Sequence, residues 1–237
     1  MIGALGGSGT RVAAQALIDA GAYLGDRLNQ ARDNLVFTEM FKQPDWFARA
    51  SDEEVHRRLD EFAALMREQA GTAPVWGWKE PNSHVLLPHL IDHFPGLRYV
   101  YVARHGLDMA YSRNQTQLRI WGARFGVAAP DDAPAPGAQV DFWIAATRRA
   151  VELGRERLGE RFLFLRFEDL CRAPEVQIGR LLDFAGVVHD DALVRRLAAE
   201  VEVPATIGRW RRNAGMFTPA QIDAVESFGF DVGRQPA

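Results

Sequence analysis

The N-terminal 18 residues constrain the fold most, because a glycine-rich turn there joins a short apolar run to a helix-like segment. Residues 1–5 predict a strand, Gly6-Gly7-Ser8-Gly9-Thr10-Arg11 a tight turn, and residues 12–18 a helix. Glycines let the backbone take a positive φ and approach a ligand closely. The helix that follows aims free N–H groups and a positive dipole end at the turn. The turn therefore predicts a phosphate site, with a plain strand-to-helix turn as the alternative.

Two common nucleotide motifs do not fit this turn. The ATP and GTP P-loop reads G-x-x-x-x-G-K followed by Ser or Thr, whereas Thr10 directly follows Gly9 and the lysine is missing. The dinucleotide fingerprint needs G-x-G-x-x-G and an acidic residue about 20 positions later. The glycines here are wrongly spaced, and Asp26 is the nearest acid to that position. The turn indicates a phosphate more clearly than it indicates which nucleotide.

Strands and helices alternate along the rest of the chain. Short apolar runs rich in aromatic or β-branched side chains predict strands at residues 75–78, 97–103 and 161–167. Helical periodicity or helix-start signals predict helices at residues 51–71, 139–158, 176–184 and 191–201, and from Thr218 onward. This alternation predicts one α/β domain over residues 1–237, with a three-layer α/β/α fold and a central, mostly parallel sheet.

Groups suited to anions follow three of the predicted strands directly. The glycine turn follows the first strand, Lys79 the second and Arg104 the third. Because ligands of open parallel sheets bind at the carboxyl ends of the strands, we expect these groups to meet at one edge. The alternatives are an ordinary exposed lysine at position 79 and a structural salt bridge between Arg104 and Asp108.

The composition excludes several other classes of protein. A net charge of −3 argues against a general nucleic-acid binder, although Arg209, Arg211 and Arg212 cluster near the C-terminal end. Cys171 is the only cysteine, which excludes an internal disulfide and fits a cytoplasmic location. No apolar run approaches the ~20 residues of a membrane helix. Met1 leads straight into the first strand, so no signal peptide is expected, and no His/Cys cluster indicates a metal site.

The glycine turn and residues 101–112 resemble motifs of the sulfotransferases that use 3′-phosphoadenosine 5′-phosphosulfate (PAPS). The turn resembles their 5′-phosphosulfate loop. In their 3′-phosphate motif an arginine ends a strand and a serine follows eight positions later, as Arg104 and Ser112 do. Residues 164–170, which read Phe-Leu-Arg-Phe-Glu-Asp-Leu, are similar to the strand that follows in the family.

The resemblance extends to the C-terminal basic segment and implies a full set of nucleotide contacts. Residues 207–212 resemble the family's basic loop that closes over the nucleotide. A solvated basic turn, and a Trp210 that packs in the core, are the alternatives. The resemblance implies that PAPS, and its product 3′-phosphoadenosine 5′-phosphate (PAP), contact Gly6, Gly7, Ser8, Gly9, Thr10, Arg11, Arg104, Ser112, Arg209, Trp210 and Arg211.

One position departs from the family pattern. Many members carry Lys or Arg where this chain has Gly7, and that cation neutralises the leaving phosphate. The resemblance therefore assigns the catalytic cation to Lys79, which stands in a K-x-P setting like that of the protein-tyrosine and bacterial branches. Arg11 matches the T-R ending of the sugar-sulfating branch. For the general base we prefer Asp33; Glu39 comes next, and Glu80 and His84 also qualify by position.

The implied reaction moves a sulfuryl group from PAPS to a hydroxyl of a small-molecule, sugar or lipid acceptor. A P-loop-like ATP-dependent kinase and a non-catalytic nucleotide-binding protein of the same fold are the competing hypotheses. The Pro-, Ala- and Asp-rich segment 126–137 predicts a loop, with a lid over the acceptor site as one role. The identity of the acceptor and the oligomeric state are left open. Aromatic residues either line an acceptor cleft or form plain core: Phe37, Phe41, Trp46, Phe47 and Trp121.

Overall fold

In the part of the chain that the structure describes, the sheet has three parallel strands. The computed structural model describes residues 1–129 and 135–233. The strand order is β1-β2-β3, with Ile2 opposite Val100 and Tyr99 opposite Phe162. The bounds are Ile2–Ala4 for β1, Tyr99–Ala103 for β2 and Phe162–Arg166 for β3. Parallel neighbours need crossover connections, which helices provide here, so the predicted α/β fold is confirmed.

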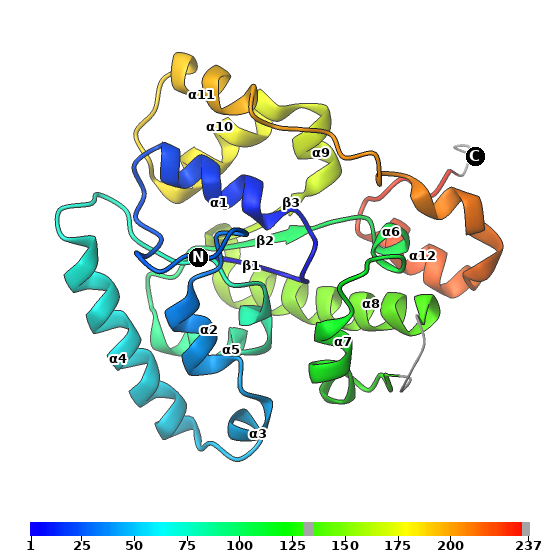
Figure 1. The fold of residues 1–237 in the computed structure, drawn as a ribbon, viewed down its shortest axis with the longest axis horizontal. Helices are drawn as coiled ribbons and strands as arrows, with labels where there is room; N and C mark the ends of the chain where they lie inside the picture. The colour runs from blue at the N-terminus through cyan, green and yellow to red at the C-terminus, as the bar shows by residue number, and fades with distance from the viewer. Residues whose placement is uncertain (130–134, 234–237) are drawn as a thin grey trace.

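Helices cover both faces of the sheet (Figure 1). One face is covered by α1 (Thr10–Asp19), α9 (Phe167–Arg172), α10 (Pro174–Ala185) and α11 (Asp191–Ala198). The other is covered by α8 (Pro136–Leu153) and α5 (Leu87–His93). The three layers match the predicted architecture.

Side chains of β2 alternate between two hydrophobic cores, as the strand period requires. Tyr99 and Tyr101 pack with the α8 side, and the Tyr101 hydroxyl lies 3.2 Å from Thr147 Oγ1. Val100 and Val102 pack with the α1 and α10 side. Because this strand is buried on both faces, its register and the position of Arg104 at its end are strongly determined.

The remaining helices surround this centre. They are α2 (Leu35–Phe41), α3 (Pro44–Phe47), α4 (Asp52–Ala70), α6 (Gly106–Met109), α7 (Thr116–Trp121) and α12 (Pro219–Ser227). Short 3₁₀ segments are Pro81–Val85, Gly122–Phe125, Gly159–Arg161 and Arg209–Met216. Two helix starts form as the sequence predicts: Ser51 caps α4, and Thr218 caps α12 with a capping box.

The predicted strand at residues 75–78 is wrong as a regular strand. The segment forms only isolated bridges, from Trp76 to Tyr23 and from Lys79 to Ile2. The Ile2 N–H donates to the Trp78 carbonyl at 3.0 Å, and the Glu80 N–H donates to the Ile2 carbonyl at 3.2 Å. Pairing ends at Pro81, which has no N–H to donate. The segment still runs parallel to β1, so it carries residues 79 and 80 to the same edge of the sheet.

Two further expectations need adjustment. The helix expected over residues 139–158 is α8, which ends at Leu153 and continues as a π-helical turn, Gly154–Leu158.

Of the segment 126–137 predicted as a loop with a lid as one role, residues 130–134 lie outside the described part, so the lid stays a prediction. Within residues 1–129 and 135–233, no helix is both long and apolar enough to cross a membrane.

Candidate active site

The glycine turn has the backbone geometry that its sequence predicts. Gly7 has φ 93° and Gly9 has φ 84°, in the left-handed region that glycine tolerates. A Cβ atom on Gly9 would collide with the ring of Phe167. A Lys or Arg at position 7 would likewise be strained, so this backbone does not accommodate the basic residue common in the family. The turn can therefore approach an anion closely but supplies no cation of its own before Thr10.

The donors of this turn are partly available. The first N–H groups of α1, which begins at Thr10, have no acceptor within the helix. The Ser8 hydroxyl is buried and has no hydrogen-bond partner among the described residues. The Ser8 N–H donates instead to the Leu5 carbonyl at 3.2 Å, so it belongs to the turn itself. These unpaired donors at a helix N-terminus fit a phosphate group.

The glycine turn opens into a cavity of about 640 Å³. Lys79 and Glu80 line it from the segment beside β1, and Asn114 and Thr116 from the start of α7. The rest of the wall outside the turn is mainly polar and comes from Arg11, Asn29, Gln30, Ala31, Asp33, Lys42, Pro81, Asn82 and Gln117. The cavity thus lies at the carboxyl end of β1, where the sequence places the site.

Lys79 and Asp33, the two residues predicted to be catalytic, form an ion pair. The Lys79 side chain is 2% exposed, and its Nζ also donates to the Ala31 carbonyl at 3.1 Å. Asp33 accepts from Lys79 with Oδ1 and from Asn29 Nδ2 with Oδ2, the latter at 2.9 Å. The exposed-lysine alternative is excluded, because this ammonium is buried and fixed at the cavity wall.

The chain contains only two lysines, Lys42 and Lys79, and both line this cavity. Lys42 directly follows the end of α2 at Phe41. The sequence analysis did not single out Lys42. With Arg11, three basic side chains line the cavity beside the two carboxyl groups of Asp33 and Glu80, within a chain of net charge −3.

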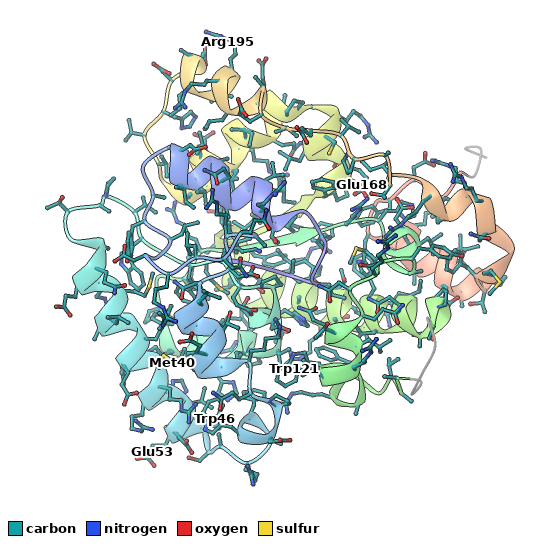
Figure 2. All side chains as sticks on the ribbon, in the orientation of Figure 1. Met40, Trp46, Glu53, Trp121, Glu168 and Arg195 are labelled. Carbon is teal, nitrogen blue, oxygen red and sulfur yellow. The ribbon has the colours of Figure 1, made fainter. Side chains whose placement is uncertain are left out.

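Glu80 is a buried carboxyl in the wall of the same cavity, with 2% exposure. Its Oε1 accepts from Asn82 Nδ2 at 2.7 Å, while Oε2 has no partner among the described residues. Asn82 is oriented in turn by Trp121, whose indole N–H donates to Asn82 Oδ1 at 3.0 Å (Figure 2). Burial raises the pKa of Glu80 to about 7, and the nearby Asp33 charge adds to the increase.

The other two candidate bases lie outside the cavity. Glu39 is exposed and makes a bidentate pair with Arg27, at 2.6 and 2.9 Å. His84 is fully buried, and burial lowers its pKa to about 3, so its ring stays neutral. Neither side chain contributes to the described wall of the cavity. Their positions in the sequence made Glu39 and His84 candidate bases. Their surroundings in the folded protein exclude both as bases for a ligand in the 640 Å³ cavity.

Arg104 directly follows the last residue of β2 and is 9% exposed. One of its terminal nitrogens donates to Thr206 Oγ1 at 2.7 Å, and its Nε has no partner in the described residues. Its guanidinium lies 5.5 Å from the centre of the Phe167 ring, the ring that also contacts the Gly9 backbone. Ser112 lies beside Gly7, with its Oγ 3.4 Å from the point a Cβ on Gly7 would occupy. Ser112 therefore borders the glycine turn directly, and Phe167 lies between Arg104 and the turn.

Asp108 does not pair with Arg104; it anchors the C-terminal basic segment. Its carboxylate accepts from the Gly208 N–H at 2.7 Å and from the Trp210 N–H at 3.0 Å. Its backbone carbonyl accepts from Arg209 Nε and from a terminal Arg209 nitrogen, at 2.8 and 2.6 Å. The predicted alternative of a structural Arg104–Asp108 bridge is therefore wrong, because Asp108 is occupied by the loop.

Arg209, Trp210 and Arg211 do not reach the wall of the 640 Å³ cavity. The Trp210 ring is buried and packs on His105, with ring centres 5.4 Å apart. Trp210 and Arg211 line a separate cavity of about 490 Å³. Its wall includes Glu168, in the first turn of α9, which Figure 2 labels. Desolvation, and then the Arg104 charge, lower the pKa of Arg209.

Four of the five aromatic residues weighed as an acceptor cleft form core instead, and the fifth, Trp46, is partly buried against that core. Phe37 and Phe41 are 1% exposed, and their ring centres lie 4.6 Å apart. Trp46 lies under the Arg58 guanidinium, away from the described cavity wall. Phe47 and Trp121 are also buried in the core. Within the described ranges, no group of three His, Cys, Asp or Glu side chains is placed to hold a metal ion.

The sheet, the glycine turn and the buried lysine define an α/β protein with an anion site at its strand ends. Residues 10–191 match the model of a family described as "Sulfotransferase family". The chain therefore belongs to the sulfotransferase family and is an enzyme. A search of curated proteins found no significant match.

Solved structures of bacterial sulfotransferase domains share the fold. The sulfotransferase domain of the Synechococcus PCC 7002 olefin synthase aligns with a TM-score of 0.60 and 19% identity, over 98% of this chain and 94% of that one. The sulfotransferase domain from the curacin biosynthetic pathway aligns with a TM-score of 0.59 and 12% identity, over 97% of both chains. Sulfotransferase STF9 from Mycobacterium avium aligns with a TM-score of 0.56 and 16% identity, over 98% of this chain and 76% of that one.

Proposed function

We propose that the protein transfers a sulfuryl group from PAPS to a hydroxyl group of a polar small-molecule or sugar acceptor. One observation carries the proposal: the buried Lys79 ammonium and the glycine turn face one cavity. PAPS supplies an activated sulfuryl group whose transfer leaves negative charge on the 5′-phosphate. Sulfuryl transfer is similar to phosphoryl transfer, in which positioning and fixed cations provide most of the catalysis.

In this proposal, Lys79 neutralises the charge that develops on the leaving phosphate or on the sulfuryl oxygens. Asp33 holds Lys79 in place, because its two oxygens are engaged by Lys79 and Asn29. This positioning role differs from the sequence-based prediction, in which Asp33 is the general base. The N–H groups of Gly7, Gly9 and Thr10, the Ser8 hydroxyl and Arg11 would hold the 5′-phosphosulfate, with Gly6 as part of the turn.

Arg104 and Ser112 would bind the 3′-phosphate. Ser112 borders the glycine turn, Arg104 follows the neighbouring strand β2, and the Arg104 Nε is unpaired among the described residues. An arginine can bind a phosphate through two parallel hydrogen bonds. Arg209 belongs to the C-terminal segment whose Thr206 accepts a hydrogen bond from Arg104, and it would add charge to the same subsite. Trp210 and Arg211 stay predictions for the adenosine side, since they line the neighbouring cavity.

The wall of the 640 Å³ cavity supports a polar acceptor over a lipid chain. Outside the turn, its side chains are amides, carboxylates, cations and a hydroxyl, apart from Ala31 and Pro81. Asn and Gln side chains both donate and accept hydrogen bonds, which suits an acceptor rich in hydroxyl groups. The aromatic residues that would have favoured an apolar acceptor do not line this cavity: Phe37, Phe41, Phe47 and Trp121 are core, and Trp46 packs against it.

We also propose that residues 1–237 form one sulfotransferase domain, because both hydrophobic cores share the same sheet. A cytoplasmic location agrees with Cys171 as the single cysteine.

Thermal-shift titration with PAP, ATP and NAD tests the donor assignment. We expect stabilisation by PAP and little by ATP or NAD, because only PAP carries the separate 3′-phosphate. If ATP stabilised the protein and PAP did not, the proposal would be contradicted. Transfer from PAPS labelled with radioactive sulfur would then be measured with N-acetylglucosamine, a phenol, a long-chain alcohol and water as acceptors. We expect the sugar to be preferred; transfer to the long-chain alcohol alone would contradict the polar-acceptor assignment.

A further inference from the structure

A second cavity, of about 670 Å³, adjoins the 640 Å³ cavity. The two cavities share Arg11, at the start of α1, and Gln30, in the loop before α2. From these residues the second cavity extends along α1 to the last turn of α11, which lies on the same side of the sheet (Figure 1). Its described wall does not include Arg104, Ser112 or Arg209, so it is separate from the proposed 3′-phosphate subsite.

Arginines from three separate segments line this second cavity. Arg11 comes from α1, Arg32 from the loop before α2 and Arg196 from the last turn of α11. Arg11 and Arg196 are exposed and have no hydrogen-bond or ion-pair partner among the described residues. Two carboxylates, Asp19 and Glu200, share the wall with the three guanidiniums, which leaves one net positive charge. Basic side chains that line a concave surface attract anions.

A strained turn holds the Arg32 side chain against α1. Arg32 has φ 66°, the only positive φ of a non-glycine residue in the described part of the chain, and arginine is strained in this conformation. Its N–H donates to the Asn29 carbonyl at 2.9 Å, and its Nε donates to Gln15 Oε1 at 2.6 Å. Gln15 Nε2 donates in turn to Asp19 Oδ1 at 2.7 Å, so that carboxylate is already engaged. The bond to Gln15 uses Nε, and the two terminal nitrogens of an arginine can bind an anion in parallel.

We propose that the second cavity binds a carboxylate or phosphate group of the acceptor, through Arg32 and Arg196. This inference rests on the proposed function and narrows its acceptor class. The acceptor is an anionic molecule longer than one sugar unit, with its hydroxyl group in the 640 Å³ cavity and its charged group in the second. Arg11 lies at the junction, because it lines both cavities.

The test compares three acceptors of equal length with labelled PAPS: cellobiose, cellobiuronic acid and cellobiose 6′-phosphate. An exposed ion pair contributes up to about 5-fold in affinity. With two arginines, we expect kcat/KM of the wild type to be roughly 25-fold higher for at least one acidic disaccharide than for cellobiose. Raising the salt concentration from about 50 to about 500 mM should reduce this preference, because exposed charges are screened. Calorimetric titration of the three disaccharides in the presence of PAP should give the same order of affinities.

Arg196→Gln is the main variant, because Arg196 is exposed on a regular helix and its replacement leaves the Arg32 turn intact. The preference for the acidic disaccharide should fall about 5-fold, and Arg196→Lys should keep most of it. Arg32→Gln combined with Arg196→Gln should remove the preference. The matched control is Arg195→Gln, which changes an exposed neighbour on α11 that is outside the cavity wall (Figure 2). It should keep the wild-type preference.

Several results would overturn this inference and leave the proposed function in place. A wild type that uses cellobiose as efficiently as both acidic disaccharides is one, and failure of both acidic disaccharides to bind in the presence of PAP is another. An Arg196→Gln variant that keeps the wild-type preference would also overturn it. If Arg196→Gln weakened PAP binding by the same factor, the cavity would serve the nucleotide and the inference would be wrong. A wild type that neither binds PAP nor transfers from PAPS would instead overturn the proposed function, and the inference with it.

Discussion

The Asp33 carboxylate pairs with the Lys79 ammonium, although the two residues are 46 positions apart. Lys79 follows the segment beside β1, and Asp33 immediately precedes Asn34, the residue that caps α2. The Asn34 N–H donates to the Lys79 carbonyl at 2.8 Å, so the backbones are joined beside the ion pair. This backbone contact fixes the distance between the two charges and places both at the cavity.

Replacing Lys79 by alanine should abolish most of the sulfuryl transfer. Removing one donor that stabilises developing charge costs about 10²–10³-fold in kcat. Lys42→Ala is a matched comparison, since it removes the only other lysine and that lysine lines the same cavity. We expect its effect mainly on KM for the acceptor. Initial rates with labelled PAPS measure both, and an equal kcat loss in the two variants would contradict the specific role of Lys79.

Replacing Asp33 by alanine should destabilise the fold by roughly 3 kcal/mol, because it leaves a buried ammonium without its charged partner. The double variant Lys79→Met with Asp33→Ala should recover much of this loss, since no unpaired buried charge remains. Urea unfolding followed by circular dichroism measures both effects. Equal stability of the single and double variants would show that the ion pair is not the cause.

The sequence predicts the edge of the sheet where the site forms, but not how its carboxylates are used. The glycine turn, Lys79 and Arg104 could be placed because each directly follows an apolar run, and parallel strands end at a common edge. The surroundings of Asp33 and Glu80 depend on burial and on the partners Asn29 and Asn82, which no local pattern records. Lys42 could have been noticed, because a chain with only two lysines makes each conspicuous.

The segment beside β1 shows a second limit of prediction. Its apolar residues indicate a strand, and its backbone does run parallel to β1. Gly77 and Pro81 keep it from forming a continuous ladder, because glycine weakens a strand and proline cannot donate to it. Likewise, the aromatic side chains of α2 could either form core or line a cleft, and the sequence is compatible with both. Only tertiary packing decides between these two outcomes.

Replacing Arg104 by alanine should reduce selectivity for the 3′-phosphate. A hydrogen bond to a charged group contributes about 1.5–3 kcal/mol, which corresponds to roughly 10- to 150-fold in Kd. Affinity for PAP should fall by that factor, while affinity for adenosine 5′-monophosphate should change little. Calorimetric titration of both nucleotides measures this, with the exposed Arg57→Ala variant on α4 as the control. An equal loss of affinity for both nucleotides would show that Arg104 contacts a part of the nucleotide other than the 3′-phosphate.

Replacing Asp108 by alanine should release the C-terminal basic segment. Its buried carboxylate accepts from two backbone N–H groups, so its removal leaves both donors unpaired at about 1–3 kcal/mol each. We expect faster proteolysis between residues 203 and 216. PAP binding should weaken as well, because Arg209 lies between Gly208 and Trp210, the two residues that the carboxylate holds, and moves with them. Limited proteolysis with mass spectrometry locates the cleavage. Unchanged cleavage in this segment would show that other contacts suffice to hold it.

The raised pKa of Glu80 should make the stability of the protein depend on pH in a defined direction. Glutamate ordinarily titrates at 4.5, and burial raises the pKa of Glu80 to about 7. Between these values the folded state keeps a proton that the unfolded state has released, so the free energy of unfolding falls as pH rises. At 1.36 kcal/mol per pKa unit, the cost above pH 7 is about 3 kcal/mol. Glu80→Gln should therefore be more stable than the wild type near pH 8 and similar near pH 5. Urea unfolding at both pH values measures this, and Glu53→Gln, which changes an exposed glutamate in the first turn of α4, should show no such difference; an equal stability gain at both pH values would rule out ionisation as the cause.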